Sequence, residues 1–256
     1  MERKNSHYYI PSGSPTDWRR LLKDLEKNWK IGYSALALAY CWEEAQVNSH
    51  EFPLCVQKVF MESKYKIFQN IKILLAFPEY KVPLPYGTTS SVNDIFILAK
   101  GGGQLISIAV EGKVNETFDE PVFRWKVKDG GGKIPRLEYL CKTLDIDIRL
   151  VNDIYYQLIH RTASAVIEAE KFKANNALML VHSFGNSVSK VDNFEEYKRF
   201  LDLFGIGNPQ KQSIIRSSKR IRGINLYFGW VEGDIKYLDE LYIKKLDMKH
   251  HWNYKS

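Results

Sequence analysis

The sequence predicts an α/β fold, because strand-like runs alternate with helical patterns along the chain. Residues 92–99 and 105–110 are apolar and rich in β-branched side chains, and a glycine-rich turn separates them. That pattern predicts a β-hairpin. Residues 177–181 are as continuously apolar as a strand that is covered on both faces. Helical patterns before, between and after these runs place the chain in the α/β class.

The first third of the chain is predicted to be helical. Ser14 followed by Pro15 is typical of a helix start, so we expect a helix from Asp17 to about Asn28. A second helix is expected from Tyr33 to about Gln46, where alanines allow close packing. A third is expected from Pro53 towards Leu75.

The rest of the chain alternates between the two kinds of element. Residues 81–85 contain two prolines, which restricts them to a sheet edge or a strand end. The hairpin follows, with 105–110 as its central strand. Beyond the hairpin we expect, in chain order, helices over 135–144 and 153–173, the strand 177–181, a helix near 195–204, a basic loop, and a strand over 224–231.

Composition limits the classes of function. The formal net charge is +7 and the pI is about 9.1, which is compatible with a polyanionic partner such as nucleic acid. Neither a signal-peptide pattern nor an apolar run long enough to span a membrane is present. We therefore expect a cytoplasmic protein without a membrane partner.

The cysteines point to a reducing compartment. Cys41, Cys55 and Cys141 are odd in number, far apart in sequence and without a CxxC pair. This pattern argues against a disulfide framework and against a cysteine zinc site.

Two carboxylates and one ammonium are predicted to meet at one end of the hairpin. Asp94 lies in the first strand, and Glu111 and Lys113 lie at the end of the second. Side chains two residues apart on a strand share a face, and pairing brings Asp94 to that face. Alternatively, the glutamate and lysine form an ordinary solvated ion pair, as such short motifs usually do.

This residue set suits the hydrolysis of phosphodiesters. Asp94 and Glu111 would bind Mg²⁺, which takes a few carboxylates together with water and substrate phosphate, with Mn²⁺ as a substitute. The backbone carbonyl of Gly112 is a further candidate ligand. Lys113 would orient or help to deprotonate the attacking water and oppose developing negative charge.

The segments 91–96 and 109–113 resemble motifs II and III of the PD-(D/E)XK superfamily, with Asn93 where the motif has proline. Segments 17–22, 32–35, 110–116 and 156–165 also resemble a family of bacterial proteins without an assigned role. The resemblance implies a restriction-endonuclease-like αβββαβ core with a mixed central sheet, helical additions at the N-terminus and further C-terminal additions. On this basis residues 1–256 form one domain, with a core of about 33–184 and an addition of about 185–256.

The same resemblance implies supporting residues on two helices. Superfamily nucleases often add a glutamate from the first core helix, which makes Glu43 a candidate metal ligand and Glu44 its neighbouring alternative. In the long helix, Gln157 resembles an extra motif of exonuclease-like members, and Arg161 is expected to bind a substrate phosphate. A solvent-facing polar stripe is the alternative for this helix.

A basic segment is the expected nucleic-acid contact outside the site. No acidic residue occurs from 203 to 231, and the candidate phosphate-binding residues there are Lys211, Arg216, Lys219 and Arg220. The alternative is a solvated loop, since basic clusters are common.

The resulting hypothesis is a Mg²⁺-dependent nuclease that acts on DNA, with homodimer formation as a further expectation. Two rivals are a catalytically silent module that binds nucleic acid or another partner, and a hydrolase of small phosphoesters. Salt-sensitive DNA binding without cleavage would select the first, and a narrow enclosed pocket the second.

Overall fold

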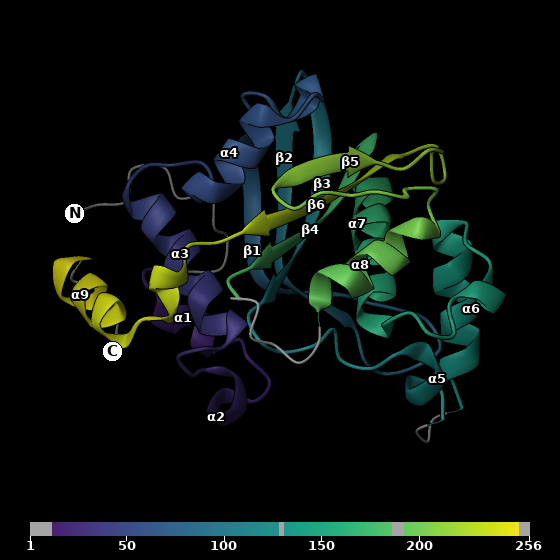
Figure 1. Cartoon of the computed structure of the whole chain (residues 1–256), viewed down its shortest axis with the longest axis horizontal. Helices are drawn as coiled ribbons and strands as arrows, with labels where there is room; N and C mark the ends of the chain where they lie inside the picture. Colours follow the sequence, from purple (N-terminus) through teal and green to yellow (C-terminus); the bar gives the residue numbers. More distant parts are fainter. Residues whose placement is uncertain (1–11, 128–130, 186–191, 251–256) are drawn as a thin grey trace.

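A computed structural model describes residues 12–127, 131–185 and 192–250, and it consists of one mixed β-sheet with helices on both faces (Figure 1). The α/β class predicted from the sequence is confirmed. The strands are β1 (Lys72–Val82), β2 (Ser91–Gly101), β3 (Gln104–Lys113), β4 (Asn176–Ser183), β5 (Ser213–Arg216) and β6 (Asn225–Glu232).

The sheet has the order β1-β2-β3-β4-β6-β5. Strands β1, β2 and β3 form an antiparallel meander, β4 and β6 run parallel to β3, and β5 is antiparallel to β6. The crossover from β3 to β4 contains α7, as a parallel connection requires. Residues beyond 184 supply β5 and β6, so the C-terminal addition is part of the same sheet.

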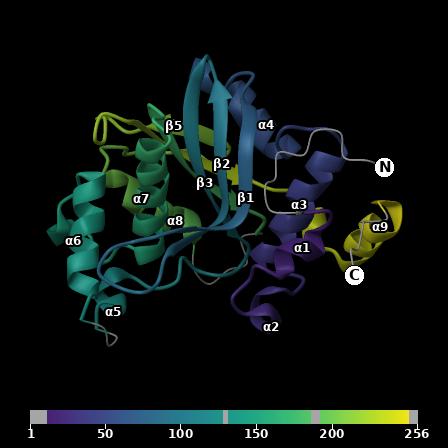
Figure 2. The same cartoon turned by 180° about the vertical axis from the view of Figure 1, so that it is seen from behind.

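Helices cover the two faces unequally. On one face, α3 and α4 pack over β3, β5 and β6, and on the other α7 packs over β2, β3 and β4. Figure 2 shows the same arrangement from behind, with α1, α2 and α9 beside α3. The helices are α1 (Pro15–Arg19), α2 (Leu25–Asn28), α3 (Ser34–Val47), α4 (Leu54–Glu62), α5 (Val122–Trp125), α6 (Lys133–Leu144), α7 (Tyr156–Lys171), α8 (Asn193–Asp202) and α9 (Glu240–His250), with three short 3₁₀ turns, η1 (Lys66–Phe68), η2 (Ile148–Leu150) and η3 (Ile235–Leu238).

Alternation along β3 divides its side chains between two cores. Ile106, Ile108 and Val110 join the cluster beneath α3 and α4, whereas Ala109 joins the cluster beneath α7. The same period of two carries Glu111 and Lys113 to the α7 face. Within the described ranges, no helix is both long and apolar enough to cross a membrane.

Several elements differ from the sequence-based predictions. The helix expected from Pro53 to Leu75 ends at Glu62, and β1 begins at Lys72. The first helix is divided into α1 and α2, and the basic loop contains the short strand β5. For β1 and β5, hydrogen bonding within the sheet overrides the local pattern, which records only apolar spacing.

Candidate functional site

The predicted carboxylates and ammonium come together where β3 ends. Extending the β2–β3 register by one residue from the Ile95–Val110 pair sets Asp94 opposite Glu111. Lys113 Nζ donates to Glu111 Oε1 at 2.7 Å, and the Gly112 amide donates to Asp94 Oδ2 at 2.8 Å. Glu111 and Lys113 are only 2% and 3% exposed. Glu111 and Lys113 therefore form a buried ion pair. The solvated ion pair that was the alternative for this motif does not form.

Arg161 of α7 joins both carboxylates. Its Nε donates to Glu111 Oε2, and its terminal nitrogen lies 3.6 Å from Asp94 Oδ1. The side chain is 7% exposed, so the solvent-facing stripe considered for this part of α7 does not form. The structure pairs Arg161 with acidic side chains of the site itself.

Glu79 is a third acidic residue at this place, and sequence reasoning missed it. It lies on β1 between Pro78, which pairs with Ile95, and Tyr80, which pairs with Asn93. It is therefore opposite Asp94 on the neighbouring strand β2. Its φ of 50° is in the left-handed region, which is uncommon for a residue with a side chain and marks a local departure from strand geometry. The three carboxylates thus form a row across three adjacent strands.

This row opens onto a cavity of about 690 Å³. β1 and β2 supply one wall, α7 another, and the segment from α1 to the start of α3 a third. The lining includes Lys23, Tyr33, Lys81, Glu116 and Asp119 together with the residues of the row, Lys113, Gln157 and Arg161. Its mixture of cations, carboxylates and an amide suits a charged, oxygen-rich ligand.

Negative charge in the row is only partly compensated. Burial, and then the neighbouring Glu111, raise the pKa of Asp94 to about 7. Burial, and then Asp94, raise the pKa of Glu79 to about 8. Although burial alone would raise it, Arg161 and Lys113 hold the pKa of Glu111 below its ordinary value. Arg161 and Lys113 therefore mainly stabilise the ionised form of Glu111, whereas Asp94 and Glu79 hold protons up to near-neutral pH.

A pH-dependent stability follows from these raised pKa values. Between about pH 4.5 and pH 8, the unfolded chain has released the Asp94 and Glu79 protons while the folded chain retains them, so the free energy of unfolding falls as pH rises. We expect Asp94→Asn to reduce the loss between pH 5.5 and pH 8.5 by about 2 kcal/mol. Urea unfolding of both proteins at the two pH values measures this, and equal losses would contradict the assignment.

Gln157 and Gly112 complete the immediate surroundings. Gln157 lines the cavity, and its Oε1 is buried without a hydrogen-bond partner within the described part of the chain. A Cβ on Gly112 would lie 2.3 Å from Leu38 Cδ1, so glycine is required for α3 to approach β3. Glu116 accepts hydrogen bonds from the Ser34 and Val114 amides at 3.3 and 3.2 Å, and so fixes the start of α3 beside the site.

Glu43 and Glu44 lie outside the cavity lining. The Glu43 carboxylate is buried and accepts hydrogen bonds from Trp18 Nε1 at 2.7 Å and from Ser12. Glu44 accepts from the Tyr237 hydroxyl at 2.7 Å. Their helix, α3, approaches the site through Ser34 and Leu38, which precede Glu43 in the same helix. The prediction that Glu43 is a metal ligand is therefore corrected. Its carboxylate instead anchors the N-terminal segment.

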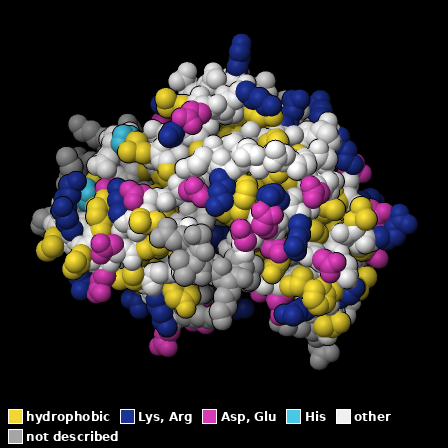
Figure 3. Space-filling view, in the orientation of Figure 1, with side chains coloured by type: hydrophobic (Ala, Val, Ile, Leu, Met, Phe, Trp, Pro, Cys, Tyr) yellow, Lys and Arg dark blue, Asp and Glu magenta, His cyan; other side chains and the backbone are white. Residues whose placement is uncertain are grey.

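The basic segment also lies apart from the cavity. Lys211 pairs with Glu232 at 3.0 Å and Lys219 with Asp145 at 2.6 Å. The guanidinium carbon of Arg216 lies 5.9 Å from the centroid of the Tyr65 ring. Arg220 is exposed. None of the four lines the cavity, and acidic and basic side chains are interspersed over the face in Figure 3. The four residues are therefore not part of the cavity, and their contact with nucleic acid outside the site stays a prediction.

For Arg216 and the residues that follow it, the position along the sheet explains this separation. Arg216 pairs with Tyr227 near the beginning of β6, whereas Glu111 is level with Val181 and Trp230 near the ends of β4 and β6. The segment after Arg216 thus starts from the opposite end of the sheet.

Comparisons with known proteins give a family but no function. No curated protein and no solved structure matches the chain. A family model described as a domain of unknown function matches residues 11–235, which include every strand and the whole row of carboxylates. The chain belongs to this family, DUF6946.

Proposed function

We propose that the protein is a metal-dependent nuclease of the PD-(D/E)XK type that hydrolyses phosphodiester bonds in DNA. The observation that carries the proposal is the placement of Asp94, Glu111 and Lys113 on one face, at the end of β3 and beside a cavity. Asp94 on one strand, followed on the next by Glu111 and, two residues later, by Lys113, has the order of residues that gives the superfamily its name. The net charge of +7 agrees with a polyanionic substrate.

The order of elements supports the same proposal. In chain order, α3, β1, β2, β3, α7 and β4 follow the αβββαβ pattern expected of a restriction-endonuclease-like core, with α4, α5 and α6 as insertions. The antiparallel meander and the parallel β4 beside β3 agree with that pattern. A fold alone does not identify an activity, so the argument depends on the side chains.

The donor set fits a hard divalent cation. Asp94 and Glu111 would hold Mg²⁺ or Mn²⁺, with the Gly112 carbonyl as a further oxygen ligand. The excess of buried negative charge that raises the pKa of Asp94 is what a bound cation would relieve. A bound Mg²⁺ supplies neutralisation of phosphate oxygens and a more acidic water.

The side chains of the chain supply the remaining chemistry. The Lys113 ammonium, fixed by Glu111 at 2.7 Å, is positioned to orient a water molecule and to oppose charge that develops on phosphate. Gln157 offers an unpartnered carbonyl oxygen to that water. Arg161 can exchange a carboxylate for a phosphate, since its planar guanidinium binds either group. Glu79, protonated near neutral pH, can donate a hydrogen bond to a phosphate oxygen.

Two alternatives have an observation in their favour. Arg161 and Lys113 already satisfy Glu111, as expected of a silent binding module in which cations of the chain replace a metal. The cavity volume of about 690 Å³ is also within the range of small-molecule sites, which agrees with a hydrolase of small phosphoesters.

A cleavage assay distinguishes the three. Supercoiled, linear and single-stranded DNA, RNA and bis(p-nitrophenyl) phosphate would each be incubated with the protein and Mg²⁺, Mn²⁺ or EDTA. We expect DNA cleavage that needs the metal, is lost in Asp94→Asn and is retained in Asp202→Asn, a control on the exposed end of α8. Salt-sensitive DNA binding without cleavage would establish the silent module, and hydrolysis of the small diester alone would establish the other rival.

A further inference from the structure

A second cluster of reactive side chains lies on the other face of the sheet, beneath α3 and α4. It consists of Cys41 on α3, Cys55 on α4 and His182 on β4, whose sulfur and ring nitrogen atoms all lie within 4.8 Å of one another. Cys55 Sγ is 3.3 Å from His182 Nε2. Two of the three cysteines, although far apart in the sequence, therefore lie close together in the fold.

The hydrogen bonds of His182 indicate which chemistry the cluster suits. Trp42 Nε1 lies 3.3 Å from His182 Nδ1, and an indole N–H only donates. Nδ1 must therefore accept, so that the proton of the neutral ring is on Nε2, facing Cys55. A metal-bound histidine has the reverse arrangement, with a free lone pair on the ligating nitrogen and a proton on the other. The cluster is thus arranged to stabilise a thiolate.

Three further features favour the thiolate at Cys55. It is the second residue of α4, a helix of 9 residues, where backbone amides stabilise negative charge. A hydrogen bond from Cys41 is the largest cause that lowers the pKa of Cys55, to about 4, and His182 lowers it further. Burial raises the pKa of Cys41. One sulfur is therefore ionised while its neighbour keeps the shared proton.

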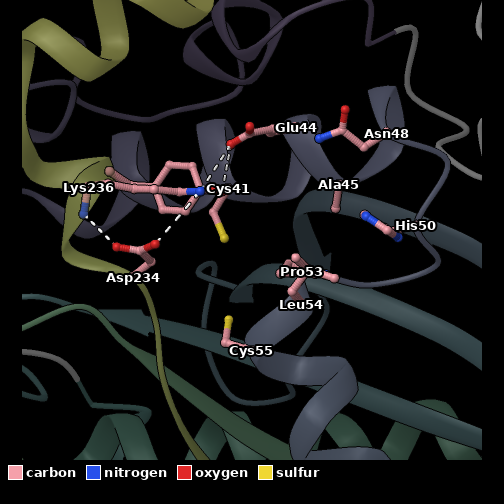
Figure 4. A pocket seen from close by; sticks show the side chains of 11 residues that line it. Cys41, Glu44, Ala45, Asn48, His50, Pro53, Leu54, Cys55, Asp234 and Lys236 are labelled. Atoms are coloured by element: carbon pink, nitrogen blue, oxygen red, sulfur yellow. Dashed lines mark hydrogen bonds and ion pairs between the residues drawn. The ribbon is translucent and has the colours of Figure 1, made fainter.

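A small molecule can reach the pair. A cavity of about 220 Å³ is lined by both cysteines together with Glu44, Asp234 and Lys236. Figure 4 shows the two sulfur atoms pointing toward each other from α3 and α4. Cys55 is partly exposed and Cys41 is buried, so an incoming reagent meets Cys55 first.

We propose that Cys41 and Cys55 form a redox-active dithiol that reacts with hydroperoxides. The Cys55 thiolate attacks the terminal peroxide oxygen, the O–O bond breaks, and the alkoxide that leaves takes up a proton, which gives Cys55 sulfenic acid and an alcohol, or water from hydrogen peroxide. The Cys41 thiol then attacks the sulfenic sulfur, a Cys41–Cys55 disulfide forms, and water leaves with the Cys41 proton. The two thiols are oxidised by two electrons and the peroxide is reduced by two.

The pH profile of alkylation tests the thiolate without any substitution. Iodoacetamide labelling of Cys55 in the full chain would be followed by peptide mass spectrometry from pH 6 to 8.5. We expect less than a twofold change in the folded protein. The same cysteine in urea provides the control, because an ordinary thiol gains roughly 150-fold over this range. A folded-state rise as steep as that in urea would overturn the proposal.

Peroxide treatment tests the dithiol. With one equivalent of hydrogen peroxide, we expect a Cys41–Cys55 disulfide in the wild type and in Cys141→Ser, and a Cys55 sulfenic acid trapped by dimedone in Cys41→Ser. Oxidation that spares Cys55 would overturn the assignment. Zn²⁺ binding at one equivalent that protects both cysteines from iodoacetamide would also overturn it, in favour of a metal site.

Discussion

Replacing Lys113 with methionine is expected to lower the rate of metal-dependent DNA cleavage by about a hundredfold or more. The substitution keeps the length of the side chain but removes the ammonium that lies 2.7 Å from Glu111 Oε1. Removing a single positioned donor near developing charge typically costs about 10²–10³ in rate. Single-turnover cleavage with saturating Mg²⁺ measures the loss separately from substrate binding.

The matched control for this experiment is Lys58→Met. Lys58 is an exposed residue of α4, 4.0 Å from Glu62, and we expect its substitution to leave the cleavage rate unchanged. Circular dichroism and thermal unfolding of both variants separate lost chemistry from lost folding. A folded Lys113→Met protein that cleaves at the wild-type rate would remove Lys113 from the proposed mechanism.

Removing Arg161 is expected to give the largest change in stability. Arg161→Met leaves Glu111, which is 2% exposed, paired with Lys113 alone among the described residues, and it removes the guanidinium that lies 3.6 Å from Asp94. Removing one partner of a buried ion pair costs about 3–5 kcal/mol. Urea unfolding at pH 7 without divalent metal measures the difference in the free energy of unfolding.

A double variant shows whether the loss comes from this pairing. In Arg161→Met with Glu111→Gln, the carboxylate charge is absent, so we expect a substantial part of the lost stability to return. Losses in the two single variants that simply add in the double variant would show that Arg161 stabilises the protein through packing alone. Glu168→Gln is the control on the same helix, because Glu168 pairs with Lys171 instead of with the site.

The sequence predicts the β2–β3 hairpin well because its signals are local. β-Branched residues, a glycine-rich turn and continuous apolarity all occur within 23 residues, from Ser91 to Lys113. The alternation of side chains then places Glu111 and Lys113 on one face without any knowledge of the rest of the fold. The long helix α7 and the strands β4 and β6 have similarly local patterns.

Glu79 could not be found in the same way, because β1 was not expected before residue 81. The segment after α4 has apolar residues at spacings that also suit a helix, and its identity as a strand depends on pairing with β2. The signal available in retrospect is the pair Pro78–Glu79, since proline restricts the chain to extended or turn geometry. Residues joined only by tertiary contacts leave weak traces in a single sequence.

The positions of Glu43 and His182 show a second limit. Helical spacing places Glu43 on the same face as small residues, but it does not reveal that Trp18, 25 residues earlier, binds the carboxylate. His182 and Cys55 are 127 residues apart and meet only because the fold brings the end of β4 to the start of α4. The sequence alone gives no reason to connect this histidine with the cysteines, because no short motif contains them.

The most direct test of the central claim is to locate a divalent metal in crystals of the protein grown with Mn²⁺. The account predicts an anomalous scattering peak bound by carboxylate oxygens of Asp94 and Glu111, with the guanidinium of Arg161 displaced from Glu111. Unchanged contacts between Arg161 and both carboxylates at saturating Mn²⁺, with no peak between them, would contradict it.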